Sequence, residues 1–334
     1  MSPDSAGEPK RALITGGAGF IGSHLSEELL NRGFQVTVID NLSTGNLENI
    51  TQLTKKPGFK LIVDSIHNDN VLHKAVKDCD VIFHLAAAVG VNLIVNDPVQ
   101  VIETNILGTH SVLKAANLYG RKTLIASTSE IYGKGIKSPF AEYDDRVLGP
   151  TTTARWSYAA SKAVDEFLAF AYHRQFNLPI VIFRLFNTVG PRQTGKYGMV
   201  LPRFVESIIA GKSPQVFGDG TQTRCFCDVR DAVNAIICLA DTDAAIGDVF
   251  NIGSENEISI LQLARLVNEV LGGPVYEPEL VPYDKAYESG FEDMLKRQPD
   301  TSKIRNLIGW ASALPLESTI SDVAKHFGYD ALGD

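Results

Sequence analysis

The chain has 334 residues, a formal net charge of -8, 44% hydrophobic residues and 21% charged residues. This composition is typical of a globular protein and excludes a disordered chain, and the length predicts about two domains or one α/β domain with an attached lobe. The acidic balance argues against a nucleic-acid partner, and no apolar run approaches the roughly 20 residues of a membrane span.

Residues 1–9 are rich in Ser, Pro, Gly and acidic side chains, and we expect a flexible tail there. They lack the apolar segment of a secretory signal, so we expect a cytoplasmic protein. Four cysteines in a chain of this length do not indicate a disulfide framework. Cys225 and Cys227 form a C-x-C that we assign to a strand, and we expect no metal site.

Short apolar segments alternate with helical patterns in the first half of the chain. We predict strands at 11–15, 35–39, 60–64, 81–85, 122–127 and 179–185, and helices at 21–31, 67–77, 98–119 and 155–176. Apolar strands that alternate with helices indicate a parallel sheet covered on both faces. The predicted class is therefore α/β, with a doubly wound Rossmann sheet.

A glycine-rich run follows the first predicted strand. Gly16, Gly19 and Gly22 form G-x-x-G-x-x-G where the first helix opens. Such glycines permit a tight turn and close approach of a pyrophosphate to the helix N-terminus. Asp40 ends the next strand, where its carboxylate can bind a ribose 2′-hydroxyl, and no Arg follows that would hold a 2′-phosphate. We predict NAD rather than NADP; a simple tight turn and a loop-starting acid are the alternatives.

Tyr158 and Lys162 lie four residues apart in a predicted helix, so their side chains share one face. A nearby ammonium lowers the pKa of a phenol from about 10. Such a tyrosine can take a hydroxyl proton while a nicotinamide accepts the hydride. A chance surface pair is the alternative for this common pattern.

The regular alternation of predicted strands and helices is interrupted at 133–153 and ends after Asn187. The stretch 133–153 predicts a loop of about twenty residues, a length that is usually functional or disordered. After Asn187 the helices shorten, and we place a smaller substrate-binding lobe at 187–224 and 253–330. Residues 10–186 then form the NAD-binding domain, to which the chain returns around 225–252.

These motifs together resemble those of the extended short-chain dehydrogenase/reductases, and the matches run from about Ala12 to Trp310. Further matching stretches are His84-Leu85-Ala86-Ala87, Thr128 with Ile131-Tyr132-Gly133, Arg184-Leu185-Phe186-Asn187, Phe217-Gly218-Asp219-Gly220 with Arg224, and Arg297 with Pro299-Asp300. The resemblance implies a bound NAD, transient oxidation at C4 of a nucleotide-sugar, and a homodimer formed through helices near 100–119 and 155–176.

The resemblance also assigns roles to residues of this chain, with Thr128 bonding the reacting oxygen. Expected cofactor contacts are Gly16, Gly19, Phe20, Ile21, Gly22, Asp40, Asn41, Ser43, Gly45, Asp64, Ser65, Leu85, Ala86, Ala87, Asn105, Tyr158 and Lys162. Expected contacts with the substrate, a UDP-linked sugar, are Asn187, Arg192, Phe217, Arg224 and Arg297.

The residues after Thr128 separate the reactions within the family. The 4,6-dehydratases usually have Asp-Glu there and simple 4-epimerases have small residues, whereas Thr128-Ser129-Glu130 is similar to the UDP-glucuronate decarboxylases, including UDP-xylose synthase. Arg155-Trp156-Ser157-Tyr158 and the stretch from Phe291 to Arg297 are also similar to decarboxylases. Val89 to Ile94 departs from them.

The implied reaction oxidises UDP-glucuronate at C4 to a β-keto acid, which loses CO₂ and gives UDP-xylose or its 4-keto form. By resemblance, Glu130 or Arg297 assists protonation at C5. The expected catalytic residues are Thr128, Ser129, Glu130, Tyr158, Lys162 and Arg297. In the simpler interpretations Glu130 is a solvated carboxylate, Ser129 a turn hydroxyl, and Arg297 only a diphosphate clamp.

Two other functions stay open at this point. A 4-epimerase acting on UDP-glucose or UDP-glucuronate would share every residue of the oxidation step. A non-catalytic NAD-binding module is the remaining alternative, and the presence of Thr128, Tyr158 and Lys162 argues against it.

Overall fold

The computed structural model describes residues 9–90, 97–135, 137–195, 198–282 and 296–329. Residues 1–8 of the expected tail, the stretch Phe291 to Asp293 and most of the departure from Val89 to Ile94 lie outside the described residues. Each strand and helix predicted above is present, with ends that differ by at most two residues.

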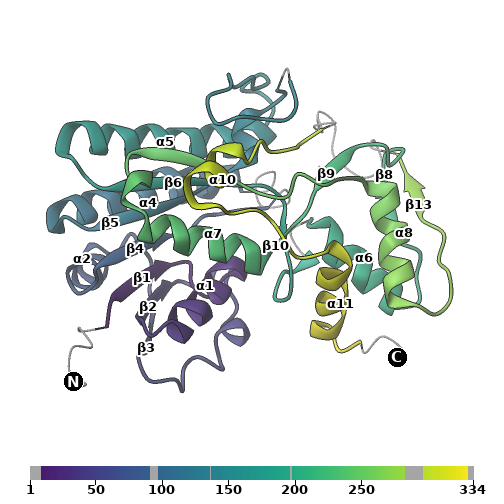
Figure 1. The fold of residues 1–334 in the computed structure, drawn as a ribbon, viewed down its shortest axis with the longest axis horizontal. Helices are drawn as coiled ribbons and strands as arrows, with labels where there is room; N and C mark the ends of the chain where they lie inside the picture. Colours follow the sequence, from purple (N-terminus) through teal and green to yellow (C-terminus); the bar gives the residue numbers. More distant parts are fainter. Residues whose placement is uncertain (1–8, 91–96, 136, 196–197, 283–295, 330–334) are drawn as a thin grey trace.

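A seven-stranded parallel sheet forms the centre of the molecule, in the order β11-β6-β5-β4-β1-β2-β3 (Figure 1). Its strands are β1 Arg11–Thr15, β2 Gln35–Asp40, β3 Phe59–Val63, β4 Val81–His84, β5 Lys122–Thr128, β6 Ile180–Leu185 and β11 Asp248–Ile252. The helices against it are α1 Phe20–Asn31, α2 Asp69–Lys77, α4 Pro98–Tyr119, α5 Arg155–Phe176 and α7 Val229–Asp241. The predicted doubly wound α/β class is confirmed.

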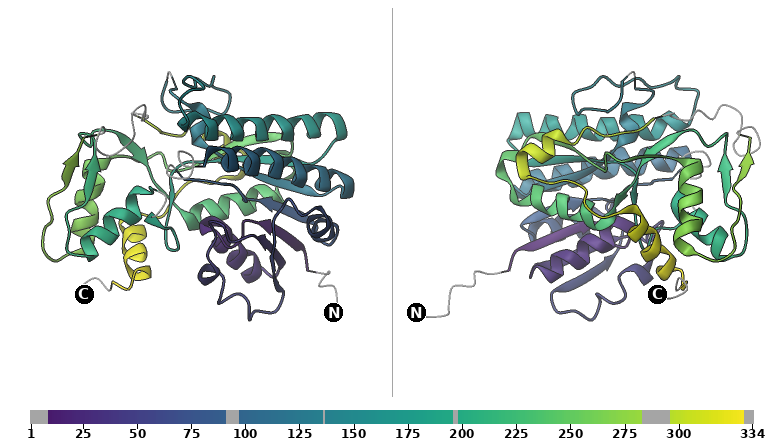
Figure 2. Two further views of the ribbon diagram at one scale, coloured as in Figure 1. Left: turned by 180° about the vertical axis from the view of Figure 1, so that it is seen from behind. Right: turned by 45° about the vertical axis from the view of Figure 1, so that its right-hand side comes forward.

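Alternating side chains of the strands build one apolar core on each face of the sheet. On β1, Ala12 and Ile14 pack in a cluster with α1 and α7, whereas Leu13 packs in a cluster with α2, α4 and α5. Figure 2 shows α4 and α5 side by side on one face. Burial on both faces explains why these strands are continuous apolar runs.

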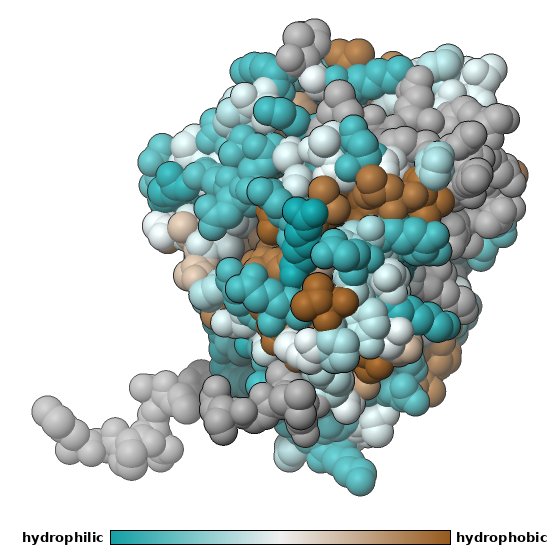
Figure 3. Space-filling view, turned by 90° about the vertical axis from the view of Figure 1, so that its right-hand side faces the viewer, coloured by the Kyte–Doolittle hydropathy of each residue, from teal (hydrophilic) through white to brown (hydrophobic). Residues whose placement is uncertain are grey.

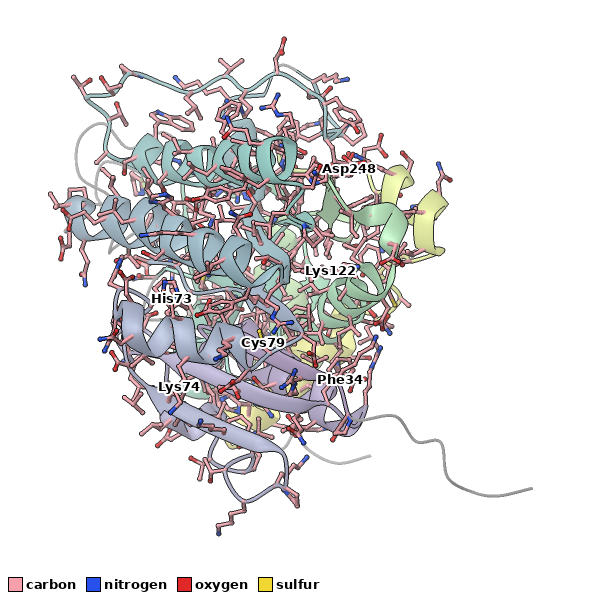
Figure 4. The ribbon with its side chains drawn as sticks, turned by 90° about the vertical axis from the view of Figure 1, so that its left-hand side faces the viewer. Phe34, His73, Lys74, Cys79, Lys122 and Asp248 are labelled. Atoms are coloured by element: carbon pink, nitrogen blue, oxygen red, sulfur yellow. The ribbon has the colours of Figure 1, made fainter. Side chains whose placement is uncertain are left out.

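The strand order reverses beside β1, which pairs with β2 on one side and β4 on the other. Because the connections leave in opposite directions there, the carboxyl ends of these strands open a crevice in which such folds bind ligands. Figure 4 shows the opposite edge, where Phe34 precedes β2, Cys79 precedes β4, and Lys122 and Asp248 begin β5 and β11.

A second group of elements has its own apolar core, which consists mainly of side chains from three helices. These are α6 Val200–Ile209, α8 Ile260–Leu271 and α11 Leu316–His326, accompanied by the short strands β8 Gln215–Phe217, β9 Thr223–Cys225, β12 Glu257–Ser259 and β13 Glu279–Val281. The chain enters this group after β7 Thr188–Val189 and returns to the sheet through β10 Cys227–Asp228, α7 and β11. Later in the chain, α10 Ser302–Ile308 contacts β11. Figure 3 views this end, where hydrophobic side chains gather across a largely hydrophilic surface.

Candidate active site

A cavity of about 1030 Å³ follows the carboxyl ends of the sheet and continues between the sheet and the second group of elements. Every site residue predicted from the sequence lines this cavity except Asn105. Asn105 is buried on α4, where its Oδ1 accepts from the Ala88 amide at 2.9 Å and its Nδ2 donates to Ser161 Oγ at 3.2 Å. The structure therefore places Asn105 behind the cavity wall, where it holds Ala88 rather than reaching the cavity.

The glycine turn lies at the centre of the crevice. Gly16 has φ +75°, and a Cβ there would lie 2.7 Å from the Ala86 backbone nitrogen, so only glycine fits between β1 and β4. A Cβ on Gly22 would overlap the Gly16 carbonyl oxygen. Gly19 is the N-cap of α1 and brings no capping side chain, so the helix presents its first amide groups to the cavity.

Asp40 ends β2 and lines the same part of the cavity. Its Oδ2 accepts from the Ala18 amide at 2.9 Å and its Oδ1 from the Leu42 amide at 2.8 Å, which joins the glycine turn to the loop after β2. Burial raises the pKa of this carboxyl, and the two amides oppose that shift. Each oxygen retains a second lone pair for a hydroxyl donor.

Thr128 and Tyr158 meet where β5 and α5 approach the cavity, and their side chains are hydrogen-bonded. Burial raises the pKa of Tyr158, and the nearby Glu130 carboxylate raises it further, while the Thr128 bond and the Arg297 charge oppose the shift. The sequence-based expectation of a lowered pKa for Tyr158 is not met in this structure, where the pKa is raised. Desolvation disfavours the phenolate more strongly than the available charges favour it.

Lys162 turns toward a buried carboxylate instead. Its Nζ lies 2.6 Å from Asp165 Oδ2, and both side chains are almost fully buried. A line of polar groups continues behind this pair, because His84 contacts Thr109 Oγ1 at 3.0 Å and Thr15 Oγ1 at 2.7 Å. Burial lowers the pKa of His84 to about 3, so this ring is neutral at pH 7. The network holds Lys162 at the cavity wall.

Glu130 lies between two arginines near the Tyr158 hydroxyl. Its Oε1 is 2.8 Å from Arg297 Nη1 and its Oε2 is 3.5 Å from Arg155 Nη2. Arg297 also lies 3.5 Å from Ser129 Oγ. The simpler interpretation of Glu130 as a solvated loop carboxylate is therefore wrong, because two guanidinium groups contact it inside the cavity.

Arg297 reaches this place through backbone pairing far from it in sequence. The Phe140 amide donates to the Gln298 carbonyl and the Asp300 amide donates to the Phe140 carbonyl, both at 2.8 Å. Asn251 Nδ2 donates to the Phe140 and Asp300 carbonyls as well. The long loop after β5 thus fixes the segment that carries Arg297.

The far end of the cavity is lined by residues of the second group of elements. Arg203 on α6 lies over the Phe217 ring at 4.2 Å, and Arg224 on β9 lines the same region. Asn187 adopts φ +30° and donates from Nδ2 to the Cys225 carbonyl at 3.2 Å. Arg192 pairs with Glu27 of α1 at 2.5 Å and lies 3.4 Å from Ser23 Oγ of the same helix.

Sequence reasoning missed several cavity residues, among them Arg155, Arg203 and His326. Arg155 carried a usable signal, since it lies three residues before Tyr158 and so shares its helix face. Arg203 and His326 carried no such signal in the sequence, because only the packing of α6 and α11 brings them to the cavity.

Within the described ranges, no group of His, Cys, Asp and Glu could hold a metal ion, and no helix is long and apolar enough to cross a membrane.

Comparison with known proteins places the chain in a family. Residues 13–323 match the model of the GDP-mannose 4,6-dehydratase family. The chain is 42% identical over 319 residues to a UDP-N-acetyl-alpha-D-glucosaminuronate decarboxylase of Bacillus cytotoxicus, covering 95% of this chain and 98% of the relative. It is 35% identical to UDP-glucuronic acid decarboxylase 1 of Xenopus tropicalis, covering 95% and 72% of the two chains.

A solved structure resembles the whole fold. UDP-glucuronic acid 4-epimerase of Bacillus cereus, in complex with UDP-glucuronic acid and NAD, has a TM-score of 0.85 at 30% identity and covers 95% of this chain and 99% of its own. The sequence-based resemblance is thereby confirmed: this chain belongs to the GDP-mannose 4,6-dehydratase family of extended short-chain dehydrogenase/reductases.

Proposed function

We propose that this protein is an NAD-dependent decarboxylase of a UDP-linked uronic acid, with UDP-glucuronate as its first candidate substrate. The Glu130–Arg297 ion pair beside Tyr158 carries the proposal, because it places a carboxylate that can relay a proton, held by an arginine, where the oxidised sugar would lie. The relatives from Bacillus cytotoxicus and Xenopus tropicalis, both named as decarboxylases, support it.

The cavity fits NAD in this proposal. The glycine turn leaves room that a Cβ would fill, the α1 N-terminus presents amide groups for a diphosphate, and Asp40 faces the cavity where an adenosine ribose would lie. Asn41, Ser43, Gly45, Asp64 and Ser65 line the adjoining wall. NAD bound there supplies the hydride acceptor and a positive charge that favours a tyrosinate.

Asp40→Ala is expected to weaken NAD binding roughly 10-fold or more, because a hydrogen bond to a charged group is worth about 1.5–3 kcal/mol. NADP binding should weaken less, since the substitution also removes a charge that repels a 2′-phosphate. Fluorescence titration with both nucleotides measures the ratio, and Asp69→Ala, at an exposed position in the first turn of α2, is the control. Equal losses for both nucleotides would argue against a ribose contact.

The chain's own residues perform the C4 chemistry as follows. The Tyr158 oxygen receives the proton of the C4 hydroxyl, and the Thr128 hydroxyl, which bonds Tyr158, aligns the same sugar oxygen. Lys162, held by Asp165, contributes a fixed positive charge to this wall of the cavity. Tyr158 returns the proton when C4 is reduced.

The C5 chemistry follows once C4 is a ketone. The bond between C5 and the carboxylate breaks, CO₂ leaves, and the electron pair moves into the C4 carbonyl to form an enolate. C5 then takes one proton that comes from solvent, and Glu130, held by Arg297, assists its delivery, while Ser129 Oγ contacts Arg297. Together with reduction at C4, these steps convert UDP-glucuronate and one proton to a UDP-pentose and CO₂, with no net redox change.

An incubation of the holoenzyme with UDP-glucuronate, followed by proton NMR and CO₂ detection, tests the proposal. We expect CO₂ in equal amount to the UDP-pentose or its 4-keto form. UDP-N-acetylglucosaminuronate is tested in parallel, because the Bacillus cytotoxicus relative carries that substrate in its name. Consumption of either uronate without CO₂ would contradict decarboxylation.

A 4-epimerase is the second candidate, favoured by the structural likeness to the Bacillus cereus UDP-glucuronic acid 4-epimerase. That reaction needs the same Tyr158 and Thr128 but returns the hydride to the other face of the sugar. UDP-galacturonate would appear in the same NMR experiment. Absence of any 4-epimer after long incubation would reject it.

We further propose a cytoplasmic protein with an NAD-binding domain at 10–186 and 225–252 and a substrate-binding lobe at 187–224 and 253–330. The separate apolar core of α6, α8 and α11 supports this division. No nucleic-acid or membrane partner is part of the proposal.

We also propose that α4 and α5 form the interface of a homodimer. Both helices pack side by side and expose large apolar side chains, among them Leu107, Leu118 and Phe167, which are 51%, 64% and 59% exposed.

Phe167→Glu should convert the dimer to a monomer, because a charge in the centre of an apolar interface loses its hydration. Light scattering after gel filtration measures the mass, with Leu280→Glu on β13 as the matched control. A wild-type monomer would contradict the proposal.

A further inference from the structure

Asn251 lies on β11 and is completely buried behind the reaction site. Its Nδ2 donates to the Phe140 carbonyl at 2.9 Å and to the Asp300 carbonyl at 3.2 Å. Its Oδ1 accepts from the Tyr132 hydroxyl at 2.7 Å. The side-chain amide therefore uses both of its N–H groups to join two segments that are distant in the sequence.

A buried chain of hydrogen bonds fixes the orientation of this amide. Arg184 Nη1 donates to the Tyr132 oxygen at 2.8 Å, and Arg184 is itself held by Glu166 of α5. Burial raises the pKa of Tyr132 to about 12, so the hydroxyl keeps its proton at neutral pH and donates it to Asn251. The opposite orientation of the amide would turn Oδ1 toward two carbonyl oxygens. Only one orientation therefore satisfies every partner.

The two carbonyls belong to the backbone pairing that carries Arg297. The Phe140 amide donates to the Gln298 carbonyl, and the Asp300 amide donates to the Phe140 carbonyl, both at 2.8 Å. Arg297 directly precedes this pairing, and its Nη1 lies 2.8 Å from Glu130 Oε1. A shift of the pairing would therefore move Arg297 relative to Glu130.

The groups that serve the oxidation at C4 are held differently. Thr128 ends β5, which pairs with β6, and Tyr158 lies on α5, whose apolar side chains pack against the sheet. Asn251 is not among the residues that line the cavity. A change at Asn251 therefore reaches the Glu130–Arg297 pair through the backbone pairing and leaves Thr128 and Tyr158 in place.

We propose that Asn251 is a positioning residue that holds Arg297 against Glu130 and thereby directs the proton to one face of C5. This inference rests on the proposed function and adds the group that supports its proton transfer from behind the cavity wall. Asn251→Asp keeps the shape of the side chain but replaces its two N–H donors by an acceptor that faces two carbonyl oxygens. The variant should release the segment that carries Arg297.

Hydrogen–deuterium exchange of the full chain tests the structural step without turnover. In Asn251→Asp, the Phe140 and Asp300 amides should exchange about 10-fold faster or more, because their hydrogen bonds open more often. Asn268→Asp is the matched control and should leave these two rates unchanged, because Asn268 is a buried asparagine of α8 whose Oδ1 accepts a backbone amide at 3.1 Å. Unchanged exchange at Phe140 and Asp300 in Asn251→Asp would overturn the inference.

Turnover of UDP-glucuronate in D₂O tests the chemical step. Proton NMR of the wild-type product should show one deuteron at a single C5 position, whereas Asn251→Asp should distribute it over both positions. Formation of the product should slow about 10- to 100-fold, as a misplaced group far from the chemistry can cause, while reduction of the nicotinamide stays within about 3-fold. A purely structural defect would slow both steps alike and keep the deuteron at one position, and that result would overturn the inference.

Arg297→Gln supplies a second comparison. If Asn251 acts through Arg297, Asn251→Asp should change product formation by less than about 2-fold in the Arg297→Gln background, whereas losses that multiply would show independent effects and contradict the inference. If Asn251→Asp does not fold, Tyr132→Phe, which removes only the hydroxyl that orients the amide, should change exchange and deuterium placement in the same direction. Failure of the wild type to release CO₂ would instead contradict the proposed function, and the exchange rates would still decide whether Asn251 holds the pairing.

Discussion

Tyr158→Phe is expected to lower turnover of the nucleotide-sugar about 10³-fold, within the range found for removal of a positioned acid or base. The substitution removes one oxygen from a buried side chain and leaves its packing against Ala88 and Val101 in place. Nucleotide and substrate affinities should therefore stay within a few-fold of wild type. Single-turnover kinetics and equilibrium titration measure the two quantities separately.

Tyr172→Phe is the matched control, because Tyr172 lies on the same helix and packs against His110 and Phe176, away from the cavity. We expect it to keep full activity. If Tyr158→Phe also kept full activity, the proton would have to leave the C4 hydroxyl by another route, and a non-catalytic NAD-binding role would regain support. A loss of substrate binding equal to the loss of turnover would point to a structural defect.

Glu166→Leu is expected to reduce the free energy of unfolding by about 3–5 kcal/mol, as found when one partner of a buried ion pair is removed. Glu166 accepts from Arg184 Nε at 2.9 Å and Nη2 at 2.7 Å, and from Ser127 Oγ at 2.6 Å. Burial lowers the pKa of Arg184, and in the wild type the hydrogen bonds and charge of Glu166 more than offset this. Arginine is not deprotonated in proteins, so Arg184 stays charged in the variant. The substitution therefore leaves a buried cation without its counterion.

Urea denaturation of the protein measures this loss, and Glu166→Gln, which keeps a neutral acceptor, should lose less. Replacing both partners, as in Glu166→Leu with Arg184→Met, should recover part of the stability because no charge then remains buried. A double variant as unstable as the sum of the single variants would show that the pair is not coupled. Stability of Glu166→Leu equal to wild type would contradict the burial of the pair.

The two expected effects differ in kind because the residues stand at different places along α5. Tyr158 faces the cavity and touches what reacts, whereas Glu166 faces β5 and β6 and joins the helix to the sheet through Ser127 and Arg184. The same 22-residue helix therefore supplies both the reacting group and its support. A stability assay and a turnover assay separate these roles.

Most of the sheet could be predicted because each strand carries its own local pattern. The runs from Arg11 to Thr15 and from Lys122 to Thr128 are apolar and short, and glycines or caps mark the helix starts between them. The helices at 98–119 and 155–176 were predicted to the residue, since Pro98 begins the first and Gly120 ends it. The second group of elements was placed only in outline, because its strands have two or three residues and its core combines distant segments.

Two expectations about side chains depend on what packs behind the cavity wall. Spacing alone put Lys162 on the face of Tyr158, and both line the cavity, but the Lys162 ammonium group pairs with the buried Asp165, three residues further along the helix. The spacing of residues along a helix does not show which of two possible partners of a side chain is buried. The assignment of Asn105 to the cofactor stays a prediction, and its bonds to Ala88 and Ser161 point to an indirect role through the cavity wall.

The amino-acid sequence by itself determined the parallel sheet, the glycine turn with Asp40, and the residues that line the cavity along α1 and β5, because each depends on patterns within a few residues. Only the tertiary structure decided that Glu130 lies between Arg155 and Arg297. Those three side chains come from the end of β5, the start of α5 and a segment near the end of the chain. The pairing of Phe140 with residues 298 and 300 joins them, and such long-range backbone pairing leaves no local mark in a sequence.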